Sequence, residues 1–522
     1  MIEKHKNYFF ISSVAIFIFS KFLFVSTVEL SRKLPTEADD AYMYTSRVNI
    51  LNKCAKNACN SIEGIKSDIN SRSNSEEIAF RKAVDRAGVL VVYKPLYTLL
   101  LKALNTFSSD ITKTYKVFRI LSVIFISSAI AYLIYLLFPK FIASCLLIIT
   151  SPAIFKAQGI HIMVPSNLAL GISAVSWALA IKRKSIILII IISALSMLCH
   201  PMGKLYSLVT IMLTVFNSEE KLLKSLLRNS LFILITAAAL LIPILVKDVP
   251  LSFSLPTADN KDIFTIFLNN LSMAFGKLNS ASSILQCSLT LLIVLTANYF
   301  HKKNLITRPS LLFSYGIILL VFLSLFHNLP RYPLELFNRV ELIFRFLKYA
   351  WILLLAQFII SYIPRTFSKP LENTIKGIVI SPVLVYFSIL MITDTKTYFL
   401  SMNKRIDRHN YQQSTEFIKH IDNHLLQTDL YLINDEILFY MYLSYGNLDK
   451  RIVFLKMLSP ENLKEITNKY IGKNVYITQT SYNTKTTPYT IESKPVFESN
   501  GYRLYKLSKD QLVIKKSTKV NI

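Results

Sequence analysis

Two adjacent carboxylates, Asp39 and Asp40, stand near the beginning of the chain, directly after its first long apolar run. Two aromatic residues, Tyr42 and Tyr44, follow them closely. A carboxylate held beside a membrane can take a proton from a hydroxyl or amine as that group attacks an activated carbon atom. Adjacent acidic residues are more often solvated loop charges, but the neighbouring apolar run and the aromatic residues favour general-base chemistry at the lipid surface.

Such a reaction would release a lipid phosphate, whose negative charge needs a cationic partner. Arg331 and Arg339 bound a short turn, and Arg345 follows in the next apolar run, about one helical turn before Lys348. Ionisable residues inside apolar runs are usually functional or reach back to the interface. The alternatives are a headgroup contact for Arg331 and a structural role for Lys348.

His200 is a weaker candidate in the short turn Cys199-His200-Pro201, between two apolar runs. Histidine changes its charge near neutral pH, so it can exchange protons with a substrate. A single histidine at a helix end is more often structural, and both interpretations stay open.

The apolar runs define the class of protein. Hydrophobic residues make up 52% of the 522 residues and charged residues only 17%, and many apolar runs approach the length of a bilayer crossing. The first run, Tyr8–Val28, has no small-residue cleavage site after it, so we predict an anchor rather than a removed signal peptide. The sequence therefore predicts an α-helical polytopic membrane protein with about 11 transmembrane helices. The expected spans are residues 8–30, 117–137, 140–156, 162–181, 185–199, 203–217, 229–246, 282–301, 309–327, 341–364 and 374–394.

Basic residues in the turns give the predicted orientation. With the N-terminus in the cytoplasm, the cytoplasmic turns carry clusters of Lys and Arg, which is the positive-inside pattern. The net charge of +27 is therefore explained by turns at a membrane and does not indicate nucleic-acid binding. Residues 185–199 and 203–217 are kept as two spans, because merging them would put three basic turns outside. The basic clusters are Lys182–Lys184, Lys221–Arg228, Lys302–Arg308 and Arg365–Lys376.

This orientation puts the large polar segments on the extracytoplasmic side of a bacterial inner or plasma membrane. We expect a transmembrane domain at 1–394, which includes a first outer loop at 31–116, and a soluble extracytoplasmic domain at 395–522. In the second domain, short β-type runs alternate with helical stretches, which predicts a small α/β domain. It has no glycine-rich phosphate loop, so we assign no nucleotide to it. The expected strands are Leu430–Ile433, Arg451–Leu455, Asn474–Thr478 and a pair near Val496–Leu507, and the expected helices are Asp435–Ser444 and Pro460–Lys469.

The first outer loop is expected to be helical in part. Ser73–Ala87 is rich in helix-forming residues, and Pro95–Leu101 begins with proline, which favours the first turn of a helix. The second stretch is too short to span, so an interfacial position fits it. Cys54 and Cys59 lie in the same loop, where a disulfide and two separate thiols are both open alternatives. Cys145, Cys199 and Cys287 lie in or beside spans and are expected to pack there.

Two short motifs resemble those of the C-type membrane glycosyltransferases, the GT-C superfamily, which includes protein O-mannosyltransferases and lipid A aminoarabinose transferases. Glu37-Ala38-Asp39-Asp40-Ala41-Tyr42 is similar to the acidic motif that follows their first span. Tyr93-Lys94-Pro95-Leu96-Tyr97-Thr98-Leu99-Leu100 is similar to the Pro-x-Tyr helix that closes their first outer loop. The span count, the outer loop and the outer C-terminal domain also match, so the resemblance covers nearly the whole chain.

The resemblance implies a transferase of the cell envelope. Such enzymes move a hexosyl or pentosyl group from a polyprenyl-phosphate donor to a lipid, glycan or protein acceptor on the outer face, usually with inversion. Asp40 or Asp39 would be the general base, with preference for Asp40. A divalent metal bound at the pair is one alternative, although relatives carry a further acidic residue that the turn before Pro165 lacks; no other cofactor is expected. The substrate-binding residues would be Tyr42, Tyr44, Lys94, Tyr97, His200, Arg331, Arg339 and Arg345.

Three other classes are weighed against this interpretation. A transporter or flippase usually breaks its spans with glycine and proline, whereas this chain has only 11 Gly. An O-antigen-type polymerase or ligase would be expected to centre on Arg and His in a late outer loop, but residues 247–281 contain no Arg. A relative that binds polyprenyl lipids without turnover is the third alternative.

Overall fold

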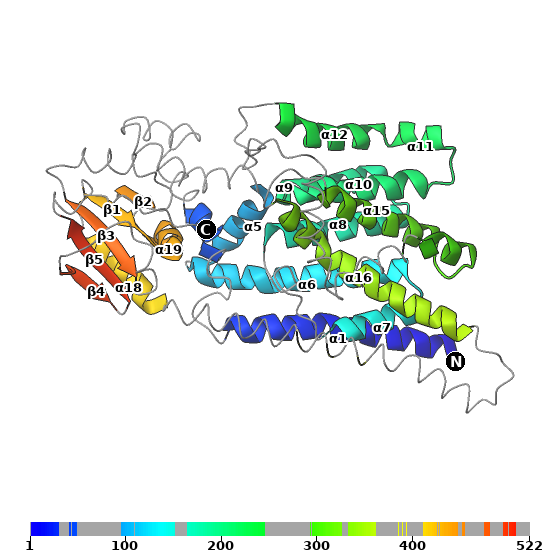
Figure 1. The fold of residues 1–522 in the computed structure, drawn as a ribbon, viewed down its shortest axis with the longest axis horizontal. Coiled ribbons are helices and arrows are strands. Elements are labelled where there is room, and N and C mark those ends of the chain that lie inside the picture. Colours follow the sequence, from blue (N-terminus) through cyan, green and yellow to red (C-terminus); the bar gives the residue numbers. More distant parts are fainter. Residues whose placement is uncertain are drawn as a thin grey trace, which may run out of the picture. The chain divides into compact units, whose positions relative to one another are not determined.

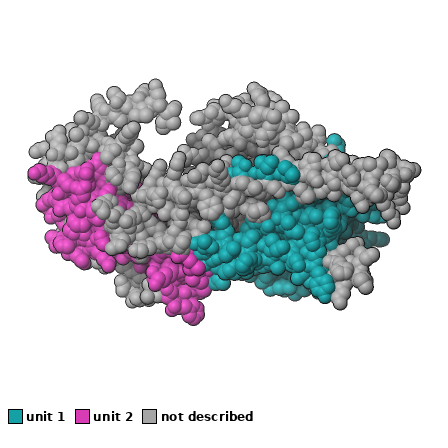
Figure 2. All heavy atoms as spheres, turned by 90° about the horizontal axis from the view of Figure 1, so that it is seen from below, with its two compact units in different colours: residues 1–27, 119–400 teal, residues 28–118, 401–522 magenta. Residues whose placement is uncertain are grey.

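The computed structural model divides the chain into two compact units, coloured in Figure 2. Unit 1 comprises Met1–Thr27 and Arg119–Leu400, and unit 2 comprises Val28–Phe118 and Ser401–Ile522. The structure describes residues 2–30, 41–42, 44–49, 95–108, 110–151, 164–245, 293, 295–325, 332–361, 385, 389, 393, 411–424, 426, 429–446, 451–454, 474–480, 494–499 and 501–507.

Unit 1 is a set of apolar helices (Figure 1). Two long helices, α1 (Ile2–Leu30) and α6 (Ile111–Leu137), begin or end in the other unit. The other described helices are α7 (Lys140–Thr150), α8 (Pro165–Ile181), α9 (Ile186–Cys199), α10 (Met202–Phe216), α11 (Leu222–Arg228), α12 (Ser230–Leu245), α15 (Arg308–Leu325) and α16 (Tyr332–Ser361).

Helix α8 contacts α9 and α10 within unit 1. It begins at a proline and is rich in Ala, Ser and Gly, so neighbouring backbones can approach closely. Two serine pairs join α8 to α9, with Oγ–Oγ distances of 2.7 Å for Ser173–Ser196 and for Ser176–Ser193. A Cβ atom on Gly203 of α10 would lie only 2.3 Å from the backbone of Ser196. Small side chains and interhelical hydroxyl pairs are the packing devices of helices inside a bilayer.

A buried lysine fixes the end of α7. Lys21 of α1 is 3% exposed, and its Nζ donates to the carbonyl oxygens of Thr150 at 2.9 Å and Ser151 at 2.8 Å. Ser20 Oγ also donates to the Ser151 carbonyl, at 2.8 Å. The last carbonyls of a helix have no partner within the helix, so a cation placed there satisfies them and offsets the negative end of the helix dipole.

Two described helix stretches are long and apolar enough to cross a membrane, namely Asn7–Thr27 and Ile111–Leu137. A third is added if α11 and α12, bent by 63° at their junction, form one broken span. These findings are compatible with a membrane protein, and the first two stretches fall at the predicted spans 8–30 and 117–137.

The prediction of about 11 spans is not reproduced by the described residues. Helix α7 has 11 residues, and α9 and α10 have 14 and 15. At a rise of about 1.5 Å per residue, helices of this length are shorter than the hydrocarbon core of a bilayer, about 30 Å. The predicted break between 185–199 and 203–217 is present, because α9 ends at Cys199 and α10 begins at Met202. Spans 282–301 and 374–394 lie largely outside the described residues.

Polar contacts bring several helix ends together at one end of unit 1. Lys140 Nζ, at the start of α7, donates to Asn7 Oδ1 of α1 at 2.7 Å. The Ser310 hydroxyl, in the first turn of α15, donates to the carbonyl of Leu137, the last residue of α6. The start of α7 therefore lies beside the start of α1, and the start of α15 beside the end of α6.

Unit 2 contains a five-stranded sheet with the order β2-β1-β3-β5-β4. Strands β1 (Leu430–Ile433), β2 (Arg451–Phe454) and β3 (Val475–Thr480) run parallel, and β4 (Phe497–Ser499) and β5 (Tyr502–Leu507) extend the sheet in antiparallel fashion. All four residues of β1 are buried, as expected for a central parallel strand. Helix α18 (Tyr411–His424) contacts β4, and α19 (Glu436–Tyr445) contacts β1.

The predicted strands and the predicted helix at Asp435–Ser444 are confirmed to within a few residues. Asp435 caps α19, because its Oδ1 accepts from the backbone N–H of Leu438 at 2.8 Å. The predicted helix at Pro460–Lys469 lies outside the described residues. The small α/β fold of this segment is therefore present.

Candidate functional site

The candidate site is built on a helical segment that starts one residue after Asp40. Ala41–Tyr42 and Tyr44–Asn49 are helical. We call this the post-acidic segment, residues 41–49, of which Met43 is not described. Nearly every described side chain in it is buried, although the segment belongs to a predicted outer loop. A polar loop at a membrane surface would expose such residues, so this segment is held by specific packing within unit 2.

Aromatic side chains hold the post-acidic segment against α5 (Pro95–Asn105). The ring centres of Tyr44 and Tyr97 are 4.8 Å apart, and Tyr97 in turn meets Phe118 of α6 edge-on at 5.2 Å. Tyr97 is fully buried, whereas Leu99 and Leu100 on α5 are exposed. Aromatic pairs at these distances contribute free energy beyond the burial of their area. Helix α5 starts at Pro95, as predicted, and its Tyr97 packs against Tyr44 of the post-acidic segment.

Arg47 brings a buried positive charge into this cluster. Its side chain is fully buried, and its guanidinium carbon lies 4.5 Å from the centre of the Tyr44 ring. A cation over the face of a tyrosine is attracted by the negative π cloud, and the attraction grows when water is excluded. A delocalised guanidinium is also the cation best suited to bind carboxylate or phosphate oxygens.

The other side of the post-acidic segment contacts α19. Thr45 Oγ1 and Ser444 Oγ are 2.8 Å apart, and the Ser444 hydroxyl lies 3.2 Å from the Tyr42 carbonyl. Asn49 Nδ2 donates to the Leu443 carbonyl at 2.9 Å. The Tyr42 ring meets that of Tyr445 edge-on, with 6.1 Å between centres, and Tyr42 belongs to the same apolar core as the sheet. Residues almost 400 positions apart in the sequence thus pack into one hydrophobic core.

The ends of the two long helices are fixed close to each other in unit 2. Lys116 Nζ, near the start of α6, donates to the Glu29 carbonyl at 3.0 Å, one residue before the end of α1. Asp110 caps α6, since its Oδ1 accepts from the backbone N–H of Thr112 at 2.8 Å. The residues that flank the first outer loop on both sides are therefore anchored.

The structure places three of the predicted site residues, Tyr42, Tyr44 and Tyr97, in the buried packing of unit 2, and their role in substrate binding stays a prediction. Arg339 lies on α16 and its side chain is not described. The remaining predictions for this region fall on Asp39, Asp40, Lys94 and Arg331, which lie outside the described residues.

His200 has a structural role in the turn between α9 and α10. Its Nδ1 accepts from the backbone N–H of Met202 at 3.0 Å, and its carbonyl accepts from Gly203 N–H at 2.8 Å. These bonds shape the turn that brings Gly203 against α9. These contacts fit the structural alternative, and the substrate-binding role of His200 stays a prediction.

Arg345 lies half-buried on α16, in unit 1. Lys348, one turn later, is 8% exposed, and its Nζ is 4.8 Å from the centre of the Phe344 ring. A small hollow beside it is lined by residues of α16 and of the helical stretch 295–300, including Thr296, Phe300 and Trp351. The Lys348 ammonium thus lies over the Phe344 ring, and Trp351 lines the same hollow.

Arg47 and Ser444 are site residues that sequence reasoning missed. Arg47 follows Tyr44 by three residues, a spacing that places two side chains on the same helix face, and this signal was available. Nothing in the local sequence of Ser444 indicates its partner at position 45.

Cysteine and metal chemistry find no support among the described residues. No group of three or more His, Cys, Asp or Glu side chains that could hold a metal occurs there. Cys199 is buried and its Sγ donates to the Pro165 carbonyl at 3.3 Å, while Cys145 is half-buried, as predicted for packing residues. Cys54, Cys59 and Cys287 lie outside the described part of the chain.

Two comparisons with known proteins give no match. No family model matches this chain, and no curated protein matches it at a significant level. The resemblance to membrane glycosyltransferases therefore rests on the sequence alone.

Proposed function

We propose that this chain is a GT-C-like membrane glycosyltransferase that moves a sugar from a polyprenyl-phosphate donor to an acceptor on the extracytoplasmic face. One observation carries the proposal. The acidic motif and the Pro-x-Tyr motif lie about fifty residues apart in the sequence, and Tyr44, two residues after the acidic motif, packs against Tyr97 of the Pro-x-Tyr motif with 4.8 Å between ring centres. Two motifs with a common function have to meet in space, and two chance matches have no reason to.

In the proposed reaction, a hydroxyl or amine of the acceptor attacks the anomeric carbon of the donor sugar. The new bond forms on the face opposite the leaving group, the bond from carbon to phosphate oxygen breaks, and the configuration inverts. The Asp40 carboxylate takes the proton that the acceptor loses, and the polyprenyl phosphate leaves with the electron pair of the broken bond. Asp39 orients the acceptor or binds a divalent cation.

Arg47 is a further candidate cation in the proposed reaction, in addition to the predicted arginines. It is a buried guanidinium seven residues after Asp40, held over Tyr44. In the proposal it sets the electrostatic potential around the acidic pair, which keeps the base ionised. Because it is buried, we treat Arg47 as a positioning residue.

The full architecture of eleven spans belongs to this proposal. The contacts of Asn7 with Lys140 and of Leu137 with Ser310 support placing these helix ends on one common side, and the basic turns give the proposed side. With the N-terminus in the cytoplasm, the acidic pair and the C-terminal sheet would share the outer compartment. Cysteine-labelling from outside, at Ser73 and Lys494 substituted one at a time, tests this sidedness.

The experiment that tests the function uses membranes containing the full-length protein and a panel of radiolabelled polyprenyl-phosphate sugars, with mixed envelope lipids and glycans as acceptors. Asp40→Asn keeps the shape of the side chain and removes the base. We expect transfer to fall by about 10²–10⁴-fold, the usual contribution of a general base. Asp68→Asn in the same loop is the matched control and should keep full transfer.

If Asp40→Asn and Asp39→Asn both keep full transfer, the catalytic assignment is wrong. Donor binding without turnover by the wild type, with every acceptor class present, favours the lipid-binding alternative. Neither binding nor transfer of any polyprenyl-linked sugar would contradict the glycosyltransferase proposal as a whole.

A further inference from the structure

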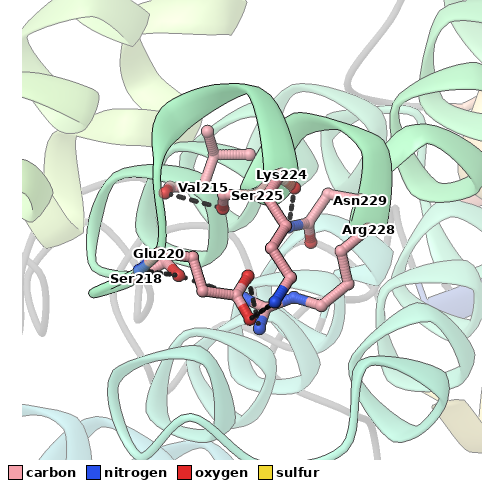
Figure 3. Close-up of polar contacts among 7 residues, drawn as sticks. All are labelled: Val215, Ser218, Glu220, Lys224, Ser225, Arg228 and Asn229. Atoms are coloured by element: carbon pink, nitrogen blue, oxygen red, sulfur yellow. Dashed lines mark hydrogen bonds and ion pairs between the residues drawn. The ribbon is translucent and has the colours of Figure 1, made fainter.

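The elbow between α10 and α12 has an arrangement that the proposed function does not use. We define the elbow as residues 215–229, shown in Figure 3; it contains the whole of α11. Ser225 Oγ donates to the Val215 carbonyl at 2.9 Å, and Asn229 Nδ2 donates to the Ser225 carbonyl at 2.8 Å. These two buried polar side chains fasten α11 to the end of α10 and to the start of α12.

Helix α11 turns its apolar side chains outward. Its only buried residue is Ser225, whereas Leu223 and Leu227 are 71% and 66% exposed. Leu222 and Leu226 are exposed as well, and so is Leu231 at the start of α12. In water, a helix buries leucine and exposes serine. The reverse arrangement is stable where the surrounding medium is apolar, so these leucines are placed to enter the acyl region of a bilayer.

The basic side chains of the elbow stand beside those leucines. Lys221, Lys224 and Arg228 are all exposed, and long basic side chains can extend from an apolar surface to the phosphate level of a membrane. Arg228 forms an ion pair with Glu220 at 3.1 Å and also donates to Ser218 Oγ at 3.4 Å. Lys224 Nζ also lies 4.0 Å from the Glu220 carboxylate, so the contacts drawn in Figure 3 hold this carboxylate between two basic side chains and keep it from repelling an anion.

A second basic turn, residues 182–184, contacts the elbow. Arg183, between α8 and α9, forms an ion pair with Glu219, which holds the pKa of that carboxyl below its usual value. Asn217 Nδ2 donates to the Ile181 carbonyl at 3.4 Å, which fixes the two turns side by side. Residues 182–184 and 217–229 together hold six basic and two acidic side chains, a net charge of +4, and each acidic one is paired with an arginine.

We propose that this elbow is a docking surface for anionic phospholipid of the surrounding leaflet. The exposed leucines of α11 insert among the acyl chains, and Lys221, Lys224 and the basic turn at 182–184 bind the phosphodiester headgroups. Charge complementarity favours a lipid of net negative charge over a zwitterionic one, because anionic headgroups attract basic residues near the membrane surface. The inference is independent of whether the chain transfers sugars.

The test uses the full-length protein in bilayers of phosphatidylcholine, with spin-labelled phosphatidylglycerol or spin-labelled phosphatidylcholine as the probe. The fraction of probe immobilised by the protein gives the preference for the anionic lipid. Each lysine near the surface favours an anionic leaflet by about fivefold. We expect Lys221→Gln/Lys224→Gln to lower the preference at least fivefold. The matched control, Lys302→Gln/Lys303→Gln, loses the same charge in a turn without the exposed leucines and should keep most of the preference.

A second measurement keeps the proposal testable if the charge variants fold poorly. Tryptophan placed at the exposed position 223 by Leu223→Trp should be quenched by phosphatidylglycerol brominated on its acyl chains, more strongly than the native Trp177, which is buried. Equal loss of preference in the two lysine pairs would overturn the proposal, because it would indicate only the general field of a basic protein. A residue-223 tryptophan quenched by aqueous iodide and not by the brominated lipid would overturn it as well.

Discussion

The post-acidic segment at 41–49 and helix α11 are both short, and both carry basic residues, but they bury opposite kinds of side chain. The post-acidic segment buries two tyrosines and the guanidinium of Arg47. Helix α11 buries only Ser225 and leaves its leucines exposed. One segment is therefore built to lie inside protein, and the other is built to meet an apolar medium.

The difference shows how the surroundings, rather than composition, decide what a short helix buries. A guanidinium can leave water only if aromatic faces and hydrogen-bond acceptors replace its hydration, and Tyr44 provides part of that replacement. Exposed leucines are costly in water and cost little in lipid. The two segments thus indicate different neighbours, which substitution at each of them can test.

The largest effect is expected in the post-acidic segment. Tyr97→Ala removes the ring that joins Tyr44 to Phe118, and loss of a fully buried aromatic side chain costs about 3–5 kcal/mol. Hydrogen exchange of the purified protein should show that peptides covering 44–49 and 95–101 open more readily. Tyr97→Phe keeps the ring and should behave as the wild type within about 1 kcal/mol. Unchanged protection in Tyr97→Ala would contradict the packing role.

A smaller effect is expected where α19 contacts the post-acidic segment. Ser444→Ala removes one partner of the buried Thr45 hydroxyl, which keeps a 3.3 Å contact with the Tyr42 carbonyl, and should lower the free energy of local opening by about 1 kcal/mol. The double variant Thr45→Val/Ser444→Ala removes both hydroxyls together. If the pair interacts as described, the double variant should cost less than the sum of the two single ones. Strict additivity would argue against the contact.

Ser225→Ala tests the packing of α11 in the elbow. It should lower the free energy of local opening by about 1 kcal/mol, because one hydrogen bond to the Val215 carbonyl is lost. Hydrogen exchange at residues 222–229 should rise, while exchange at residues 41–49 stays unchanged. A change spread over both regions would mean that the serine supports the whole fold rather than the elbow.

The sequence predicted best those elements whose signal is local. β1 was expected at Leu430–Ile433 and has these bounds, because a short run of large apolar residues ending before Asn434 and Asp435 is typical of a buried strand. The start of α5 at Pro95 and the break at His200-Pro201 follow from proline in the same way. Among the described residues, two or three helices are long and apolar enough to span, fewer than predicted there, because run length alone does not show where an apolar helix stops or bends, as at Asn229.

The candidate site was predictable only in part. The tyrosines were identified from their position after the acidic pair, but their burial depends on α5 and α19, far away in the chain. Arg47 carried a helical spacing to Tyr44 that could have been used. The hydrogen bond between Thr45 and Ser444 joins residues 399 positions apart, and no periodicity in either stretch encodes it.

The smallest effect on stability is expected at Leu223, and it separates the two regions most clearly. Leu223→Gln alters a side chain that is 71% exposed, so the free energy of unfolding in detergent should change by no more than about 0.5 kcal/mol. Leu213→Gln, on the buried face of α10, is the matched control and should destabilise by several times as much, because an amide would enter the core. Thermal unfolding followed by circular dichroism measures both. If the two substitutions cost the same, the leucines of α11 are packed like those of α10, and the contrast between a helix facing protein and one facing lipid is wrong.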